Sequence, residues 1–173
     1  MRLFIAIPFE KEVRDRLTDL QETLKAGGIR GRFTPSENIH MTLAFIGDYA
    51  DPDRILDIME TVPFRPFTLQ PEGLQHFRDL YLLRVRENPA LSSYVRRLRR
   101  ALSDEEIPFD RKKFRPHITL ARKVIMPEQG LRMPAMMPAG DAEVRRISLM
   151  RSDRGRHGMI YTDIGGVGDD RPY

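Results

Sequence analysis

The sequence of 173 residues contains no cysteine. Disulfide bonds, thiolate metal sites and a cysteine nucleophile are therefore excluded, and the composition fits a reducing cytoplasm, where we expect the protein to be located. No stretch approaches the roughly 18 consecutive apolar residues that a membrane-spanning helix needs. The apolar residues 1–10 are too short for a signal peptide and lack a small-residue cleavage site, so we expect no membrane partner.

Metal-binding patterns are missing as well. A zinc site needs about three or four His, Cys or carboxylate ligands, and neither H-x-H nor H-E-x-x-H occurs among the four histidines. We therefore expect the protein to work without a metal and without any other cofactor.

The composition is that of an ordinary globular domain, with 40% hydrophobic and 31% charged residues. The length and the lack of a recognisable linker indicate one domain over residues 1–173, which we expect to be monomeric. The formal net charge of +4 suits a polyanionic partner such as RNA, although charge alone indicates only non-specific affinity.

Hydrophobic periodicity predicts a mixture of strands and helices. The predicted helices are residues 10–26, a short helix from residue 52, and residues 89–104. Asp51 and Asn88, each followed by a proline, are predicted to cap the last two. Helical spacing in the last one predicts an inner face of Leu91, Tyr94, Val95, Leu98 and Leu102. The predicted strands lie near residues 2–7, 39–47, 67–76, 79–86, 117–122, 143–151 and 158–164. The segments 31–38 and 126–140 are predicted to be loops, since they are rich in turn-forming residues or have no clear period.

The order of these elements repeats along the chain. A strand, a helix, a strand with the sequence HMTL and a short helix occupy the first half. A hairpin, a helix, a strand with the sequence HITL and a final hairpin occupy the second half. The repetition predicts an α+β fold of two pseudo-symmetric lobes, each a small antiparallel sheet with helices, and an active groove between the lobes.

The short motif H-x-T-L occurs twice in the predicted strands, as His40 with Thr42 and as His117 with Thr119. Side chains alternate between the two faces of a strand, so each histidine shares a face with its threonine while the intervening residues face the core. If the two halves are related by symmetry, both His-Thr pairs meet in one groove. A single match is weak, but two matches in corresponding positions indicate a function.

This arrangement suits the cleavage of a phosphodiester. Such a reaction needs a base that activates the nucleophile and an acid that protonates the leaving oxygen. Histidine has an ordinary pKa of about 6.5, so near neutral pH one imidazole can be neutral while the other is protonated. The threonine hydroxyls can donate hydrogen bonds to the non-bridging phosphate oxygens, where negative charge grows in the transition state.

The chain resembles the two-histidine phosphoesterase superfamily at these motifs, and in particular the bacterial and archaeal RNA 2′,3′-cyclic phosphodiesterases, formerly called 2′-5′ RNA ligases. The resemblance extends over nearly the whole chain and is carried by residues 1–7, 35–48, 110–122, 147–153 and 158–164. It implies metal-independent hydrolysis of a terminal 2′,3′-cyclic phosphate on RNA or on a nucleotide, with a 2′-phosphate as product.

The resemblance also implies roles for individual residues. His40 and His117 are the acid–base pair, and we expect His40 to protonate the leaving O3′ and His117 to activate water. Thr42, Thr119 and Arg122 bind the phosphate, for which the planar guanidinium of arginine is well suited.

Phe45 is the residue that the resemblance assigns to stacking on the terminal nucleobase. Both Phe45 and Arg122 follow their histidine by five residues, and in a regular strand this offset puts them on the opposite face. They can reach the groove only if the strand ends, twists or contains a bulge before them.

Two other kinds of function stay open. The same groove suits 2′-5′ RNA ligation, or hydrolysis of small cyclic nucleotides or ADP-ribose cyclic phosphate. A non-catalytic module that binds RNA ends is the third hypothesis, and the complete pair of motifs argues against it because binding alone needs no matched acid and base.

Overall fold

The computed structural model describes residues 1–131 and 140–170. In chain order its elements are β1 (Arg2–Pro8), α1 (Lys11–Ala26), β2 (Arg30–Phe33), η1 (Ser36–Asn38), β3 (His40–Asp48), α2 (Pro52–Thr61), β4 (Phe67–Leu69), β5 (Pro71–Phe77), β6 (Leu80–Val85), α3 (Pro89–Asp104), β7 (His117–Ile125), β8 (Ala142–Val144), β9 (Arg146–Gly155) and β10 (Gly158–Gly168). Residues 132–139 of the loop expected over 126–140 lie outside the described residues.

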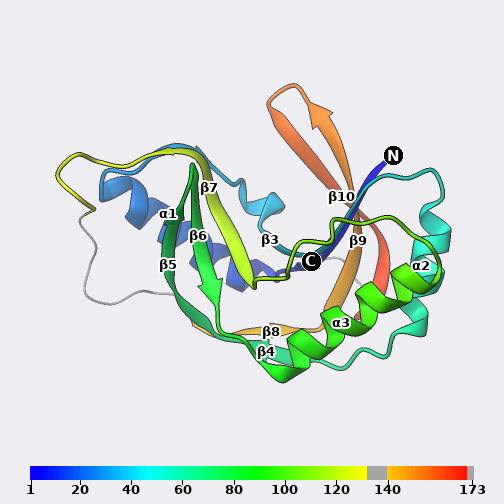
Figure 1. Ribbon diagram of the computed structural model, residues 1–173. Coiled ribbons are helices and arrows are strands. Elements are labelled where there is room, and N and C mark those ends of the chain that lie inside the picture. Colours follow the sequence, from blue (N-terminus) through cyan, green and yellow to red (C-terminus); the bar gives the residue numbers. More distant parts are fainter. Residues whose placement is uncertain (132–139, 171–173) are drawn as a thin grey trace.

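Two four-stranded antiparallel sheets form the two lobes (Figure 1). Sheet A has the strand order β10-β9-β1-β3, and sheet B has the order β2-β7-β6-β5. The short strands β4 and β8 pair separately. The strands that begin with the two motif histidines, β3 in sheet A and β7 in sheet B, contact each other. The prediction of a two-lobed α+β fold with antiparallel sheets is confirmed.

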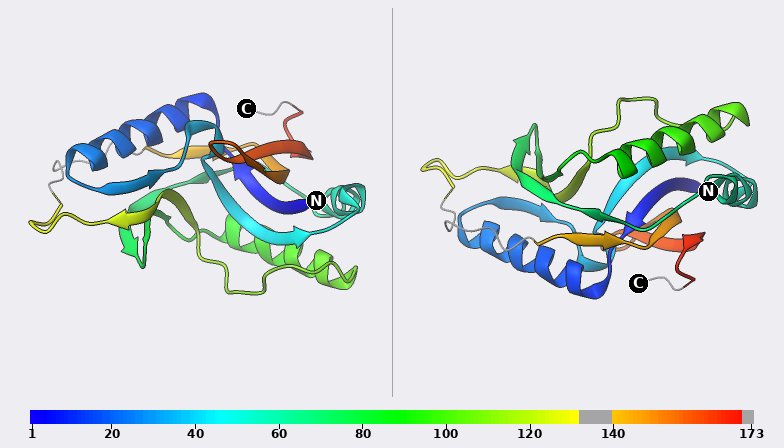
Figure 2. Two further views of the ribbon diagram at one scale, coloured as in Figure 1. Left: turned by 90° about the horizontal axis from the view of Figure 1, so that it is seen from above. Right: turned by 90° about the horizontal axis from the view of Figure 1, so that it is seen from below.

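The helices α1 and α3 lie on opposite sides of the molecule, with the strands between them (Figure 2). The inner face of α3 is formed by the residues that helical spacing predicts, Leu91, Tyr94, Val95, Leu98 and Leu102, all of which are buried. One hydrophobic core includes residues of both sheets and of the three α-helices. In the part of the chain that the structure describes, no helix is long and apolar enough to cross a membrane.

The predicted helix starts are confirmed in detail. The side chain of Asp51 accepts a hydrogen bond from the backbone N–H of Arg54 at 3.2 Å, and Asn88 accepts one from Leu91 at 2.8 Å. Each of these caps satisfies an N–H that the first helical turn leaves without a partner.

The prediction of a plain loop over residues 31–38 is wrong. The segment contains most of β2, which pairs with β7, and the short helix η1. Strand β2 has only four residues, and its first three are exposed, so it has no apolar alternation by which it could be recognised. Strand β2 is extended because it pairs with β7.

Candidate active site

His40 is the first residue of β3, and both of its ring nitrogens have partners. Nδ1 lies 2.6 Å from the carbonyl oxygen of Asn38, and Nε2 lies 3.0 Å from Oγ1 of Thr42. A carbonyl oxygen can only accept, so Nδ1 carries a hydrogen. The remaining nitrogen, Nε2, is therefore the atom that can gain or release a proton during a reaction.

His117 is the first residue of β7 and is held in the same way. Its Nδ1 lies 2.7 Å from the carbonyl oxygen of Arg115, so this ring also carries a hydrogen on Nδ1 and leaves Nε2 for proton transfer. Thr119 follows two residues later on the same face of the strand, and both side chains are partly buried. The two motifs thus present equivalent pairs of an imidazole and a hydroxyl.

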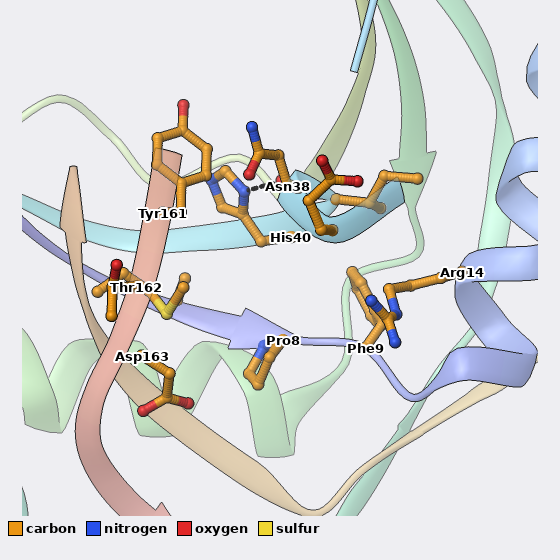
Figure 3. A pocket seen from close by; sticks show the side chains of 12 residues that line it. Pro8, Phe9, Arg14, Asn38, His40, Tyr161, Thr162 and Asp163 are labelled. Atoms are coloured by element: carbon orange, nitrogen blue, oxygen red, sulfur yellow. Dashed lines mark hydrogen bonds between the residues drawn. The ribbon is translucent and has the colours of Figure 1, made fainter. Parts of the chain in front are cut away.

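Two aromatic rings lie beside His40, whose ring centroid is 5.0 Å from that of Phe4 and 5.3 Å from that of Tyr161. The Tyr161 ring stands next to His40 in Figure 3. Burial lowers the pKa of His40 below its ordinary value, while the hydrogen bond to the Asn38 carbonyl acts in the opposite direction. The positive charge of Arg122 lowers this pKa further. Arg122 and His117 both belong to β7, the strand that contacts β3.

Each motif strand contains a β-bulge at its leucine. In the pairing of β1 with β3, Ala6 lies opposite Thr42 and Ile5 lies opposite Ala44, which leaves Leu43 as an extra residue. In the pairing of β6 with β7, Leu82 lies opposite Thr119 and Tyr81 lies opposite Ala121, which leaves Leu120 as an extra residue. The two bulges occur at the same position of the two motifs.

Each bulge brings the residue two places after it, Phe45 in β3 and Arg122 in β7, to the face of its own strand that carries the motif histidine. Along β3 the buried positions alternate regularly up to Leu43 and then shift by one residue, and β7 shows the same shift after Leu120. Phe45 consequently packs against a small cluster formed by Phe4, Ala6, Met150 and Tyr161, the rings of which also contact His40. Arg122 is exposed.

A cavity of about 330 Å³ adjoins His40 on the side of β1 and β10. Its apolar wall includes Pro8 and Phe9, and Arg14, Tyr161 and Asp163 contribute polar groups (Figure 3). No sequence motif marks these last three residues. Arg14 is distant from both motifs in the sequence and lies in a predicted helix, and Tyr161 and Asp163 lie in a predicted strand.

Within residues 1–131 and 140–170, no group of three or more His, Cys, Asp or Glu side chains gathers in a way that could hold a metal ion. His40 and His117 supply two nitrogen atoms, and the neighbouring groups are hydroxyls and a guanidinium. This set of side chains suits the binding of an anion with proton transfer at two sides.

Comparison with known proteins identifies the family. The sequence profile of the 2′-5′ RNA ligase superfamily matches residues 9–156. A protein of Methanothermobacter thermautotrophicus named RNA 2′,3′-cyclic phosphodiesterase is 28% identical over 95% of this chain and 96% of its own length. A protein of Thermus thermophilus with the same name is 30% identical over 94% of this chain and 87% of its own length.

Solved structures show the same fold. The crystal structure of Escherichia coli LigT in its apo form is similar with a TM-score of 0.80 and 24% identity, and covers 96% of both chains. The crystal structure of TT0787 of Thermus thermophilus is similar with a TM-score of 0.78 and 25% identity, and covers 97% of both chains. With the matched profile and the paired motifs on adjoining strands, the chain belongs to the 2′-5′ RNA ligase superfamily.

Proposed function

We propose that the protein hydrolyses the terminal 2′,3′-cyclic phosphate of RNA to a 2′-phosphate by metal-independent acid–base catalysis. The observation that carries the proposal is the equivalence of the two motifs, in which each histidine has its Nδ1 fixed by a backbone carbonyl and its Nε2 left for proton transfer. The names of the relatives, RNA 2′,3′-cyclic phosphodiesterase, and the crystal structure of LigT complexed with 3′-AMP support the substrate class.

The proposed reaction uses water as the nucleophile. Nε2 of His117 accepts a proton from water as the water oxygen attacks phosphorus, and the bond between phosphorus and O3′ breaks. Nε2 of His40 donates its proton to O3′, which leaves a free 3′-hydroxyl and a 2′-phosphate. The hydroxyls of Thr42 and Thr119 and the guanidinium of Arg122 bind the non-bridging oxygens and stabilise their growing charge.

The environment of His40 suits the role of acid. A lowered pKa makes the imidazolium a stronger acid, which favours donation to an alkoxide leaving group. The anionic phosphate of the substrate favours the protonated form when it binds beside the ring, because an opposite charge stabilises the charged form. The cavity next to His40 provides room for the sugar or base of a nucleotide.

The test is incubation of the purified protein, in the presence of EDTA, with a short RNA that ends in a 2′,3′-cyclic phosphate and with adenosine 2′,3′-cyclic monophosphate. We expect the RNA to gain the mass of one water and the mononucleotide product to co-elute with 2′-AMP and not with 3′-AMP. A 3′-phosphate product, or activity that EDTA abolishes, would refute the proposal. ADP-ribose cyclic phosphate is assayed in parallel. Hydrolysis of this compound, with no hydrolysis of the RNA or of the mononucleotide, would indicate a different substrate.

The cytoplasmic location and the monomeric state also stay predictions. Sedimentation of the purified protein measures the mass of the particle in solution, for which the chain mass of 20.1 kDa is the expected value.

A further inference from the structure

The carbonyl oxygens of the two bulge residues, Leu43 and Leu120, each accept hydrogen bonds from the side chain of a helix. Nε2 of Gln21 on α1 donates to the Leu120 oxygen at 3.0 Å and to the Thr34 oxygen at 2.8 Å. Nε and Nη2 of Arg99 on α3 donate to the Leu43 oxygen at 3.1 and 2.9 Å. The two motif strands are thus supported at equivalent points, each by one polar side chain.

Gln21 lies in the hydrophobic core, where a polar side chain is costly unless its hydrogen bonds are made. Its neighbours on the inner face of α1 are Leu17, Leu20 and Leu24, all of them buried. A leucine or methionine would continue this face. The two carbonyl oxygens that accept from Nε2 are therefore the feature of the structure that explains an amide at this position.

Arg99 is fixed on several sides. Besides the two bonds to Leu43, Nη1 donates to the carbonyl oxygen of Lys112 at 2.7 Å. The guanidinium lies 5.8 Å from the ring centroid of Phe109 and 5.7 Å from that of Phe114, within the range of cation–π attraction. A side chain held in this way can keep the Leu43 carbonyl in one orientation.

We propose that Gln21 and Arg99 are positioning residues that stabilise the two bulges. Gln21 acts through Leu120 and keeps Arg122 on the face of β7 that carries His117, and Arg99 acts through Leu43 and keeps Phe45 on the face of β3 that carries His40. The inference rests on the proposed function for its substrate, while the geometry of the bulges does not depend on it. Bulges near active sites commonly redirect a side chain in this way.

The physical reason is the loss of the side-chain bonds that hold the bulge. Gln21→Met keeps the approximate volume of the side chain but removes both N–H donors. The Thr34 oxygen then loses its Gln21 partner, and the Leu120 oxygen keeps only the bond from the backbone N–H of Thr34 at 2.9 Å. With the Leu120 carbonyl less firmly held, we expect Arg122, two residues further along β7, to be displaced. Because small displacements of a binding group reduce rates strongly, we expect a loss of about tenfold in kcat/KM.

A double-mutant cycle tests the route through Arg122. Wild type, Gln21→Met, Arg122→Gln and the double variant are compared in kcat/KM on adenosine 2′,3′-cyclic monophosphate and in the Kd of 2′-AMP measured by calorimetry. If Gln21 acts through Arg122, the double variant loses no more than Arg122→Gln alone, because the positioned group is already absent. The Kd of 2′-AMP still tests the role of Gln21 if the protein does not hydrolyse the cyclic phosphate.

A matched control separates positioning from stability. Leu24→Val shortens a fully buried side chain on the same helix and keeps both donors of Gln21, and we expect it to lower Tm while leaving kcat/KM unchanged below the transition. The same cycle with Arg99→Met and Phe45→Leu tests the other bulge. Losses that multiply in both double variants, or full activity and affinity in Gln21→Met, would overturn the inference.

Discussion

His40 and His117 occupy equivalent positions, and each ring is oriented by the carbonyl oxygen of the residue two places earlier. The distances from Nδ1 are 2.6 Å to Asn38 and 2.7 Å to Arg115. Both imidazoles therefore present the same nitrogen, Nε2, for proton transfer. This equivalence makes the consequences of changing either residue comparable.

Replacing either histidine by alanine should remove most of the activity. A positioned general acid or base contributes about 10² to 10⁴ in rate, so His40→Ala and His117→Ala should each lower kcat by a factor in that range. The measurement is steady-state turnover of adenosine 2′,3′-cyclic monophosphate, with Tm as a check of folding. His157→Ala, in the exposed turn between β9 and β10, is the control and should keep full activity. Near-normal turnover in either motif variant would exclude that histidine from catalysis.

The pH dependence of kcat/KM should distinguish the acid from the base. The profile reports the pKa values of the free enzyme, and the pKa of His40 lies below its ordinary value because of burial and of the charge of Arg122. If His40 is the acid, kcat/KM falls as the pH rises through this lowered pKa. Arg122→Gln removes a charge that lowers the pKa, so the falling limb should move to higher pH.

A rising limb at the same place, which also moves to higher pH in Arg122→Gln, would assign His40 as the base. A limb that Arg122→Gln leaves in place would belong to another group.

Replacing Phe45 by leucine should weaken substrate binding through the base. Stacking of a nucleobase on an aromatic ring is worth about 1–3 kcal/mol, so KM for adenosine 2′,3′-cyclic monophosphate should rise about tenfold. Phe45 also packs against the small cluster that contains Phe4, and leucine preserves an apolar contact there. Methyl riboside 2′,3′-cyclic phosphate, which has no base, should be hydrolysed equally by the wild type and the variant. An equal loss on both substrates would argue against stacking.

A buried ion pair at the edge of the cavity should contribute to stability. Burial alone raises the pKa of Asp163, but hydrogen bonds from Arg146 and Ser148 outweigh it and keep this pKa below its ordinary value. Asp163→Asn leaves the mostly buried Arg146 without its counter-charge and should lower the free energy of unfolding by roughly 3 kcal/mol at neutral pH.

The sign of the pH dependence follows from the lowered pKa. Asp163 stabilises the fold fully above its unfolded pKa of about 4, and this contribution is lost as the pH falls through its folded pKa. The difference in unfolding free energy between wild type and Asp163→Asn, measured by urea denaturation, should therefore shrink at acidic pH. Asp153→Asn, which removes an exposed ion pair with Arg151 on the same hairpin, should change stability by less than about 1 kcal/mol.

The helices and the motif strands could be predicted because their signals are local. The caps at Asp51 and Asn88 and the apolar spacing of α3 each lie within a few residues, and the structure confirms them. Strand β2 could not be predicted, since it is extended by its pairing with β7 and not by its own residues.

The placement of Phe45 and Arg122 depends on bulges that the motif sequences do not specify. A regular strand and a bulged strand can have the same residues, and the outcome here involves side chains from α1 and α3, which are distant in the sequence. Tyr161 could not be assigned to the site for a related reason. Its ring lies beside His40, although Tyr161 belongs to β10 and His40 to β3, which are the two edge strands of sheet A.

The position of β1 between β3 and β9 has a consequence for the folding pathway. Residues Arg2–Ala6 of β1 pair with Ser148–Ser152 of β9. More than a hundred residues separate these two strands in the sequence, so their pairing must close a very long segment of chain. Such non-local pairings slow the search for the native state. We therefore expect the His40 environment, with Tyr161 supplied by the last hairpin, to be completed late in folding. A fragment that ends after β7 would contain both motifs but only part of this environment.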